Sequence, residues 1–114
     1  MAISSTLEWI CDVTRDMGAI RIKRMFGGAG LFCDNLMFGL EADEGIFFKA
    51  DDVNRPDFEA AGSRPFTYSA KDRTVSLSYW QIPEALIDDE EEMKAWALRS
   101  FEAAKRAAAK KRSK

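Results

Sequence analysis

The spacing of apolar residues changes twice along this sequence of 114 residues, and that change most constrains its fold. Near the N-terminus, residues suited to burial recur every three or four positions, as on the inner face of a helix. They are Leu7, Ile10, Cys11, Thr14 and Met17. Between residues 19 and 80, short apolar runs are separated by turn residues, which is typical of strands. The helical spacing returns at Met93, Trp96, Ala97, Ser100, Phe101 and Ala104. The pattern predicts helices on both sides of a set of strands.

The first helix is predicted to span residues 6–17. Ser5 and Glu8 have the spacing of a capping box, in which the Ser hydroxyl accepts from the third helical N–H and the Glu reaches back. Gly18 is expected to end this helix in a left-handed conformation.

Three antiparallel strands in succession are expected next. Ile20 and Ile22 alternate with charged residues, as in a strand with one solvated face. Asp34 and Asn35 lie between two apolar runs and suit a two-residue hairpin turn, because both residues tolerate positive φ. Residues 43–45 form a second predicted turn before the next apolar run.

A short helix is predicted after these strands. Asn54 is expected to cap it, with Pro56 in its first turn. Phe58 and Ala61 are expected to face inward, and Gly62 to close the helix.

The rest of the chain predicts a second hairpin, from residues 65–68 and 74–80, and a long helix that opens at residues 88–89. The element order is then α-β-β-β-α-β-β-α. It favours an α+β fold: a two-layer sandwich of a mainly antiparallel five-stranded sheet with helices on one face. We expect one domain, residues 1–105, followed by a basic tail, residues 106–114.

Composition indicates a chain with an ordinary core, since 46% of its residues are apolar and 11% aromatic. No apolar run approaches the roughly 18 residues that a membrane span needs, and the N-terminal residues lack the pattern of a secretory signal. The two cysteines, Cys11 and Cys33, are too few for a disulfide framework. These features predict a cytoplasmic protein that does not act at a membrane.

Charge is distributed unevenly. Residues 99–114 carry seven Lys or Arg and one Glu, whereas residues 1–98 carry ten Lys or Arg and eighteen Asp or Glu. The tail could contact nucleic-acid phosphates, or it could be a solubilising helix end. Its candidate contact residues are Lys105, Arg106, Lys110, Lys111, Arg112 and Lys114. The acidic run at residues 88–92 is explained by stabilisation of a helix N-terminus.

The sequence contains no histidine. The commonest general base and the commonest metal ligand are therefore missing, as are Ser-His and Cys-His nucleophile arrangements. We expect no catalytic residue, no metal and no cofactor.

The glycine-rich stretch at residues 24–30 has two interpretations. A phosphate-binding loop would lead into a helix N-terminus, but an apolar strand pattern follows here. A bulge or tight bend between strands is therefore favoured. A basic strand face could be formed by Arg21, Lys23, Arg24 and Lys49. It could contact nucleic acid if aromatic side chains lie between the charges. The favoured interpretation is a solvated sheet edge.

Several segments in one order resemble the N-terminal domain of the TfoX/Sxy family of bacterial competence regulators. The resemblance covers roughly residues 20–105. Its signature residues are Arg24, Met25, Phe26, Gly27, Gly28, Gly30, Phe38, Lys49, Pro65, Phe66, Tyr68, Tyr79 and Pro83. It implies a fold similar to that of type III secretion chaperones and a role with the transcription machinery in DNA uptake. Full-length regulators carry a second, C-terminal domain, where this sequence has its basic tail.

Three functions are weighed against one another. The favoured one is a non-catalytic regulatory module that binds a protein partner through an exposed apolar edge or face of the sheet, and by analogy with the chaperones a homodimer is also considered. The alternative is association with nucleic acid through the basic tail. The least favoured is an enzyme that uses Lys49 or a carboxylate near the glycines.

Overall fold

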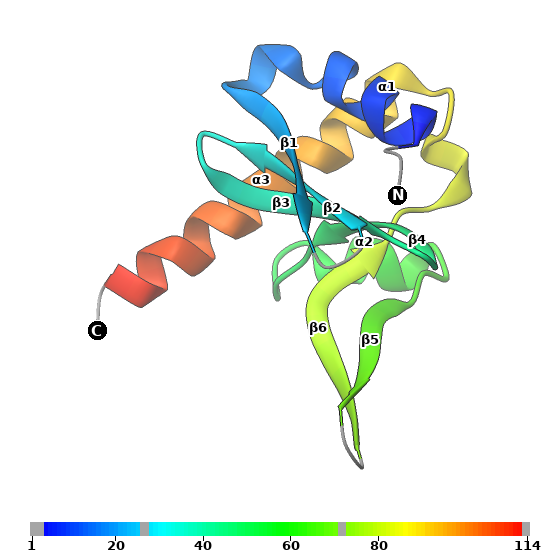
Figure 1. Cartoon of the computed structure of the whole chain (residues 1–114), viewed down its shortest axis with the longest axis vertical. Helices are drawn as coiled ribbons and strands as arrows, with labels where there is room; N and C mark the ends of the chain where they lie inside the picture. The colour runs from blue at the N-terminus through cyan, green and yellow to red at the C-terminus, as the bar shows by residue number, and fades with distance from the viewer. Residues whose placement is uncertain (1–3, 26–27, 71–72, 113–114) are drawn as a thin grey trace.

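The computed structural model describes residues 4–25, 28–70 and 73–112. Its elements follow the order α1 (Ser5–Val13), β1 (Ile20–Met25), β2 (Gly28–Cys33), β3 (Leu36–Ala42), β4 (Gly45–Lys49), α2 (Arg55–Ala60), β5 (Pro65–Ala70), β6 (Arg73–Gln81) and α3 (Glu90–Arg112), with short 3₁₀ helices at Arg15–Met17 and Glu84–Leu86. The strands form one antiparallel sheet in the order β1-β2-β3-β4-β6-β5. The α+β fold is confirmed, and Figure 1 shows α3 crossing behind the sheet.

The described sheet has six strands, so the prediction of five was wrong. The glycine-rich stretch accounts for the difference, because Gly28 and Gly30 lie inside a full strand, β2, which pairs with β1 from Met25 to Ile20. A Cβ atom added at Gly28 would lie 2.0 Å from the carbonyl oxygen of Glu41. Glycine is needed there because the neighbouring backbone is close.

The first helix begins and ends earlier than predicted. Ser4, not Ser5, caps α1: its Oγ accepts a hydrogen bond from the Leu7 N–H at 3.1 Å. The helix ends at Val13, where the buried Thr14 hydroxyl donates to the Ile10 carbonyl at 2.7 Å, and a 3₁₀ turn follows. Gly18 is extended, with φ 159° and ψ −157°, so the predicted left-handed end was wrong.

The predicted Asp34–Asn35 hairpin is confirmed, with φ of 50° and 70°. Residues 43–44 join β3 to β4, also as predicted. The second hairpin, β5–β6, is confirmed as well and projects from the body in Figure 1.

The short helix α2 has Pro56 in its first turn, as predicted. Asn54 occupies the N-cap position, but its side chain forms no capping hydrogen bond to the helix. Gly62, with φ 77°, comes directly after its cap. Phe58 is buried, but Ala61 is exposed. The inward placement of Ala61 was wrong because the helix ends one residue before it.

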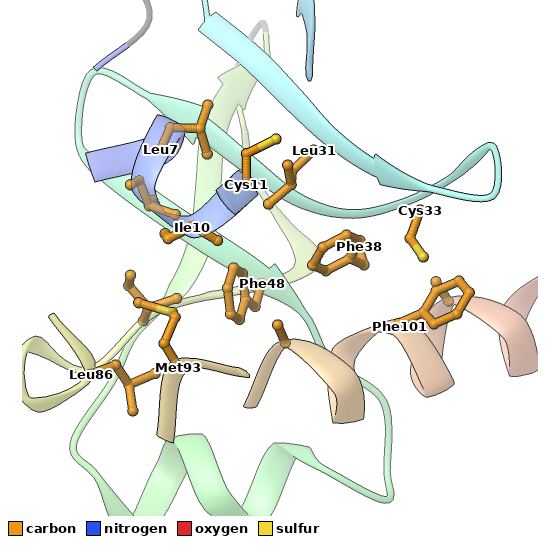
Figure 2. Packing of buried hydrophobic residues seen from close by; sticks show 14 of the residues in the cluster. Leu7, Ile10, Cys11, Leu31, Cys33, Phe38, Phe48, Leu86, Met93 and Phe101 are labelled. Atoms are coloured by element: carbon orange, nitrogen blue, oxygen red, sulfur yellow. The ribbon is translucent and has the colours of Figure 1, made fainter. Parts of the chain in front are cut away.

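The hydrophobic core lies between one face of the sheet and the helices. α3 packs on β3 and β4, while α1 contacts α3 and β1. In Figure 2, Phe38 lies between the strands and α3, with its ring centroid 5.9 Å from that of Phe48 and 6.3 Å from that of Phe101. The predicted inner face of the last helix is confirmed at Met93, Ala97, Ser100, Phe101 and Ala104, which are buried on α3. Trp96 is only partly buried and packs against the core.

Candidate functional site

A bulge in β3 decides which side chains reach the face of the sheet opposite the helices. Phe32 pairs with Met37, but the next residue, Leu31, pairs with Gly39, so Phe38 is an extra residue on β3. Simple alternation would place Leu40 beside Phe38 in the core. The bulge pairs Leu40 with Gly30 instead and turns its side chain to the other face.

We call this opposite face the outer face. Its apolar residues share one property: they do not belong to the core cluster or pack against it. They are Met25, Phe32, Met37, Leu40, Phe47, Phe66 and Tyr79.

The outer face contains a small cluster of its own. Phe47 is only 4% exposed, and its ring centroid lies 4.9 Å from that of Phe66. The Tyr79 hydroxyl donates to the Met37 carbonyl at 3.2 Å, and burial raises the pKa of Tyr79 to about 12. Beside it is a cavity of about 190 Å³ lined by Met25, Met37, Leu40, Phe66 and Tyr79, among others. This cavity is apolar and suits hydrophobic side chains.

The lining of this cavity does not have the features expected of the enzyme site that was considered from the sequence. Its one carboxylate is Glu41, whose Oε1 accepts from the Ser4 N–H at 3.3 Å. Lys49 does not line it. The glycine-rich stretch leads into strand β2 rather than into a helix N-terminus.

The four cations of the predicted basic strand face do not form one continuous patch. Arg21 lies over the Phe32 ring, 5.4 Å from its centroid, and donates to Asn35 Oδ1 at 3.3 Å. Lys49 lies on β4, three strands away from β1, with its Nζ 5.2 Å from the ring centroid of Tyr79 on the neighbouring strand β6. The cations therefore border the outer face at two separate places, and Arg24 points to the opposite face from Lys23 by strand alternation.

A second, charged site lies where the last turns of α3 pass the loop after β4. Asp51 in this loop accepts from Arg106 Nε at 2.6 Å and Arg106 Nη2 at 2.9 Å. These bonds lower the pKa of the Asp51 carboxyl. Asn54 is buried and holds the loop, since its Oδ1 accepts from the Asp51 N–H at 2.8 Å and its Nδ2 donates to the Lys49 carbonyl at 3.0 Å.

The basic tail continues α3 without a break through Arg112. Lys105 pairs with Glu102 at 3.0 Å and Arg106 pairs with Asp51, so these two cations are partly neutralised. Lys110 and Lys111 are exposed, with no ion pair to any residue of the described chain. The Arg112 side chain and Lys114 lie outside what is described.

The signature residues are spread over the fold. Met25, Gly28, Phe66 and Tyr79 meet at the outer-face cavity, Gly30 lies next to it, and Phe38 is in the core. Lys49 lies at the charged site, Arg24 is exposed on β1, Pro65 opens β5 and Pro83 follows β6. Phe26, Gly27 and the Tyr68 side chain lie outside the described residues.

Sequence reasoning did not identify Leu40 or Met37 on the outer face, or Asp51 and Ser78 at the charged site. Leu40 could not be found by alternation because the bulge interrupts it. The contact of Asp51 with Arg106 joins residues 55 positions apart, which no local pattern shows.

Within residues 4–25, 28–70 and 73–112, no three His, Cys, Asp or Glu side chains gather where an ion could be held. In the same ranges, no helix combines the length and the apolar character needed to cross a bilayer.

Comparison with known proteins agrees with this architecture. Residues 12–104 match the model of the TfoX N-terminal domain. The chain is also 26% identical, over 77 residues, to a protein named DNA transformation protein TfoX1 from Aliivibrio fischeri. That match covers 68% of this chain and 37% of the relative. The chain belongs to the TfoX N-terminal domain family.

Proposed function

We propose that this chain is a non-catalytic, cytoplasmic regulatory module that binds a protein partner through the outer face of its sheet, in the control of transcription or DNA uptake. The observation that carries the proposal is the apolar outer face, because it lies opposite the helix-covered core and contains a preformed apolar cavity. Apolar surfaces of this kind are typical of protein interaction sites. Membership of the TfoX N-terminal domain family, and the name of the transformation protein from Aliivibrio fischeri, support the regulatory process.

The charges beside the outer face indicate the chemistry of the partner. Arg21 and Lys49 border it at two places, and Lys23 is exposed on the same face of β1. A partner that offers apolar side chains flanked by carboxylates would be complementary to this surface.

Affinity capture with matched variants tests the proposal. Phe32→Glu and Met37→Glu place a charge on the outer face, whereas Leu98→Glu places one on α3 at a side chain that is 47% exposed. The parent chain and Leu98→Glu should recover the same transcription or DNA-uptake component, at low and moderate salt, and the outer-face variants should lose it. Recovery by all four chains, or by none, would contradict the proposal.

Self-association through the same face would also contradict it as stated. Sedimentation of the parent chain and of Met37→Glu separates the two cases. A monomer in both agrees with a different protein as the partner, whereas a parent dimer that Met37→Glu dissociates would assign the outer face to a second copy.

A second candidate function, nucleic-acid association through the basic tail, is favoured by the exposure of Lys110 and Lys111. Replacing both by Gln should then weaken DNA or RNA binding at every sequence and flatten its salt dependence. Unchanged affinity would remove this candidate.

A further inference from the structure

The charged site contains a groove whose function the outer face does not explain. The groove has a volume of about 480 Å³ and lies between the end of β4, the loop that follows and the last turns of α3. Its charged and hydroxyl-bearing lining includes Lys49, Asp51, Arg55, Ser78, Arg106 and Lys110.

The carboxylates of the groove are already neutralised. Asp51 accepts two hydrogen bonds from the Arg106 guanidinium, and its Oδ1 also accepts from the Val53 N–H at 3.0 Å. Asp52 accepts from Arg55 Nη2 at 2.5 Å. The two ion pairs involve both guanidinium groups and both carboxylates of the groove lining, so together these four groups add little net charge to the groove.

Two ammonium groups of the groove form no direct ion pair within the described residues. Lys49 is partly buried, and its Nζ donates to the Ser78 hydroxyl at 2.7 Å, a neutral partner. Lys110 lines the same groove, and neither lysine forms an ion pair with a residue of the described chain. Burial lowers the pKa of Lys49, the nearby Asp51 carboxylate raises it, and the charge of Lys111 lowers it. A partly desolvated cation that forms no direct ion pair is a position that a bound anion would stabilise further.

We propose that this groove binds a phosphate group, with Lys49 and Lys110 as its cationic ligands and the Ser78 hydroxyl as a neutral one. Two uncompensated charges match the charge of a phosphate monoester, and ammonium groups bind phosphate as point charges. The hydroxyl and the ammonium lie on adjacent strands, β6 and β4, so the rigid sheet positions both. The source of the phosphate is either a small molecule or the backbone of a nucleic acid.

The test is an NMR titration of the full chain with inorganic phosphate at constant ionic strength. Saturable shifts should be confined to amides near residues 49–55, 78 and 106–110. Lys49→Met and Lys110→Met keep apolar stems and remove one charge each, and each should weaken binding roughly tenfold or more. Lys23→Met removes an exposed cation from β1 and should leave the affinity unchanged.

Competition then identifies the source of the phosphate. If a short single-stranded or duplex DNA displaces phosphate and also binds less tightly to Lys49→Met, the groove holds a backbone phosphate. If phosphate binds and DNA does not compete, it holds a small phosphorylated molecule.

Other results would overturn the proposal. Shifts spread over all exposed cations, no saturation, or equal affinity of the parent and both groove variants would mean that the groove is not a phosphate site. DNA binding that depends on Lys110 and Lys111 but not on Lys49 would assign the contact to the tail alone. If the Lys49→Met variant does not fold, the phosphate affinity of Lys110→Met tests the proposal instead, because the Lys110 side chain is exposed. Outer-face variants should bind phosphate normally, so failure of the proposed function is distinguishable from failure of this site.

Discussion

The two faces of the sheet are both apolar, but they differ in what covers them. On the inner face, Leu31 and Phe48 are fully buried beneath the helices. On the outer face, their chain neighbours Phe32 and Phe47 contact Arg21 on β1 and Phe66 on β5, respectively, and of the two rings only Phe47 is buried. Neighbouring residues of one strand therefore have different surroundings: those on the inner face stabilise the fold beneath the helices, and those on the outer face form the surface that we propose for binding.

The largest expected effect compares equivalent truncations on the two faces. Phe48→Ala should lower the free energy of unfolding by about 3–5 kcal/mol, because it leaves a cavity between the sheet and the helices. Phe32→Ala should cost less than about 1.5 kcal/mol, since the side chain is partly exposed. Urea unfolding measures both.

Phe47→Ala sharpens this comparison, because Phe47 is buried on the outer face. An intermediate loss would show that the outer cluster stabilises the sheet without a helix layer. Equal losses for Phe48→Ala and Phe32→Ala would contradict the assignment of the two faces.

The next effect concerns the loop that leads from the sheet to the helix layer. Asn54→Ala should cost about 1–3 kcal/mol, because it leaves the Lys49 carbonyl and the Asp51 N–H without their buried partner. Thermal unfolding measures the loss, and Asp52→Ala, at a highly exposed neighbouring side chain, is the control. A loss of stability as small as that of Asp52→Ala would mean that water replaces the hydrogen bonds of the Asn54 side-chain amide.

A smaller effect depends on pH and concerns the pair of Asp51 with Arg106. The Arg106 guanidinium lowers the pKa of Asp51, so the folded chain takes up this proton at a lower pH than the unfolded chain, for which the pKa is about 3.9. The pair therefore stabilises the fold fully above that pH, and its contribution is lost as the pH falls through the lower, folded-state pKa. Because the two side chains are 28% and 40% exposed, we expect less than about 1 kcal/mol.

Unfolding of Asp51→Asn and of the parent, measured from pH 6 to pH 2.5, checks this dependence. The difference in unfolding free energy between the parent and Asp51→Asn should be constant near pH 6 and should become smaller as the pH falls. Arg106→Gln should show the same trend, and a difference independent of pH in both variants would refute the coupling.

The smallest effect is on the inner face, at Ser100. Its Oγ is buried and has no hydrogen-bond partner within the described chain. Ser100→Ala should therefore stabilise the protein by up to about 1 kcal/mol, since it removes a desolvated polar group and raises helix propensity. A measurable loss of thermal stability would show that the hydroxyl has a partner, such as a buried water.

Local patterns were sufficient for much of the fold. The Asp34–Asn35 turn was predicted from the tolerance of these residues for positive φ, and the inner side of α3 from the spacing between Met93 and Ala104. The first helix was misplaced by one residue at its start, because Ser4 and Ser5 are equally good caps and only one has its hydroxyl near the Leu7 N–H.

The candidate sites were less predictable. The glycine-rich stretch was predicted to form a bulge or bend between strands. Gly28 and Gly30 lie in β2, where Gly28 is close to the β3 backbone, while residues 26–27 between β1 and β2 lie outside the described residues. The lysines of the tail could be identified directly from the sequence. The pairing of Arg106 with Asp51 could not be predicted, nor could the position of Lys110 in one groove with Lys49.

Local patterns along the chain were enough to predict the α+β class, the order of most elements and the absence of imidazole, because turn preferences, apolar spacing and residue counts are local properties. The position of Leu40 on the outer face and the shared groove of Lys49 and Lys110 became visible only in the folded chain. The physical reason is that a bulge in the strand register reverses the direction of every side chain beyond it, and contacts between distant residues form only when the layers pack.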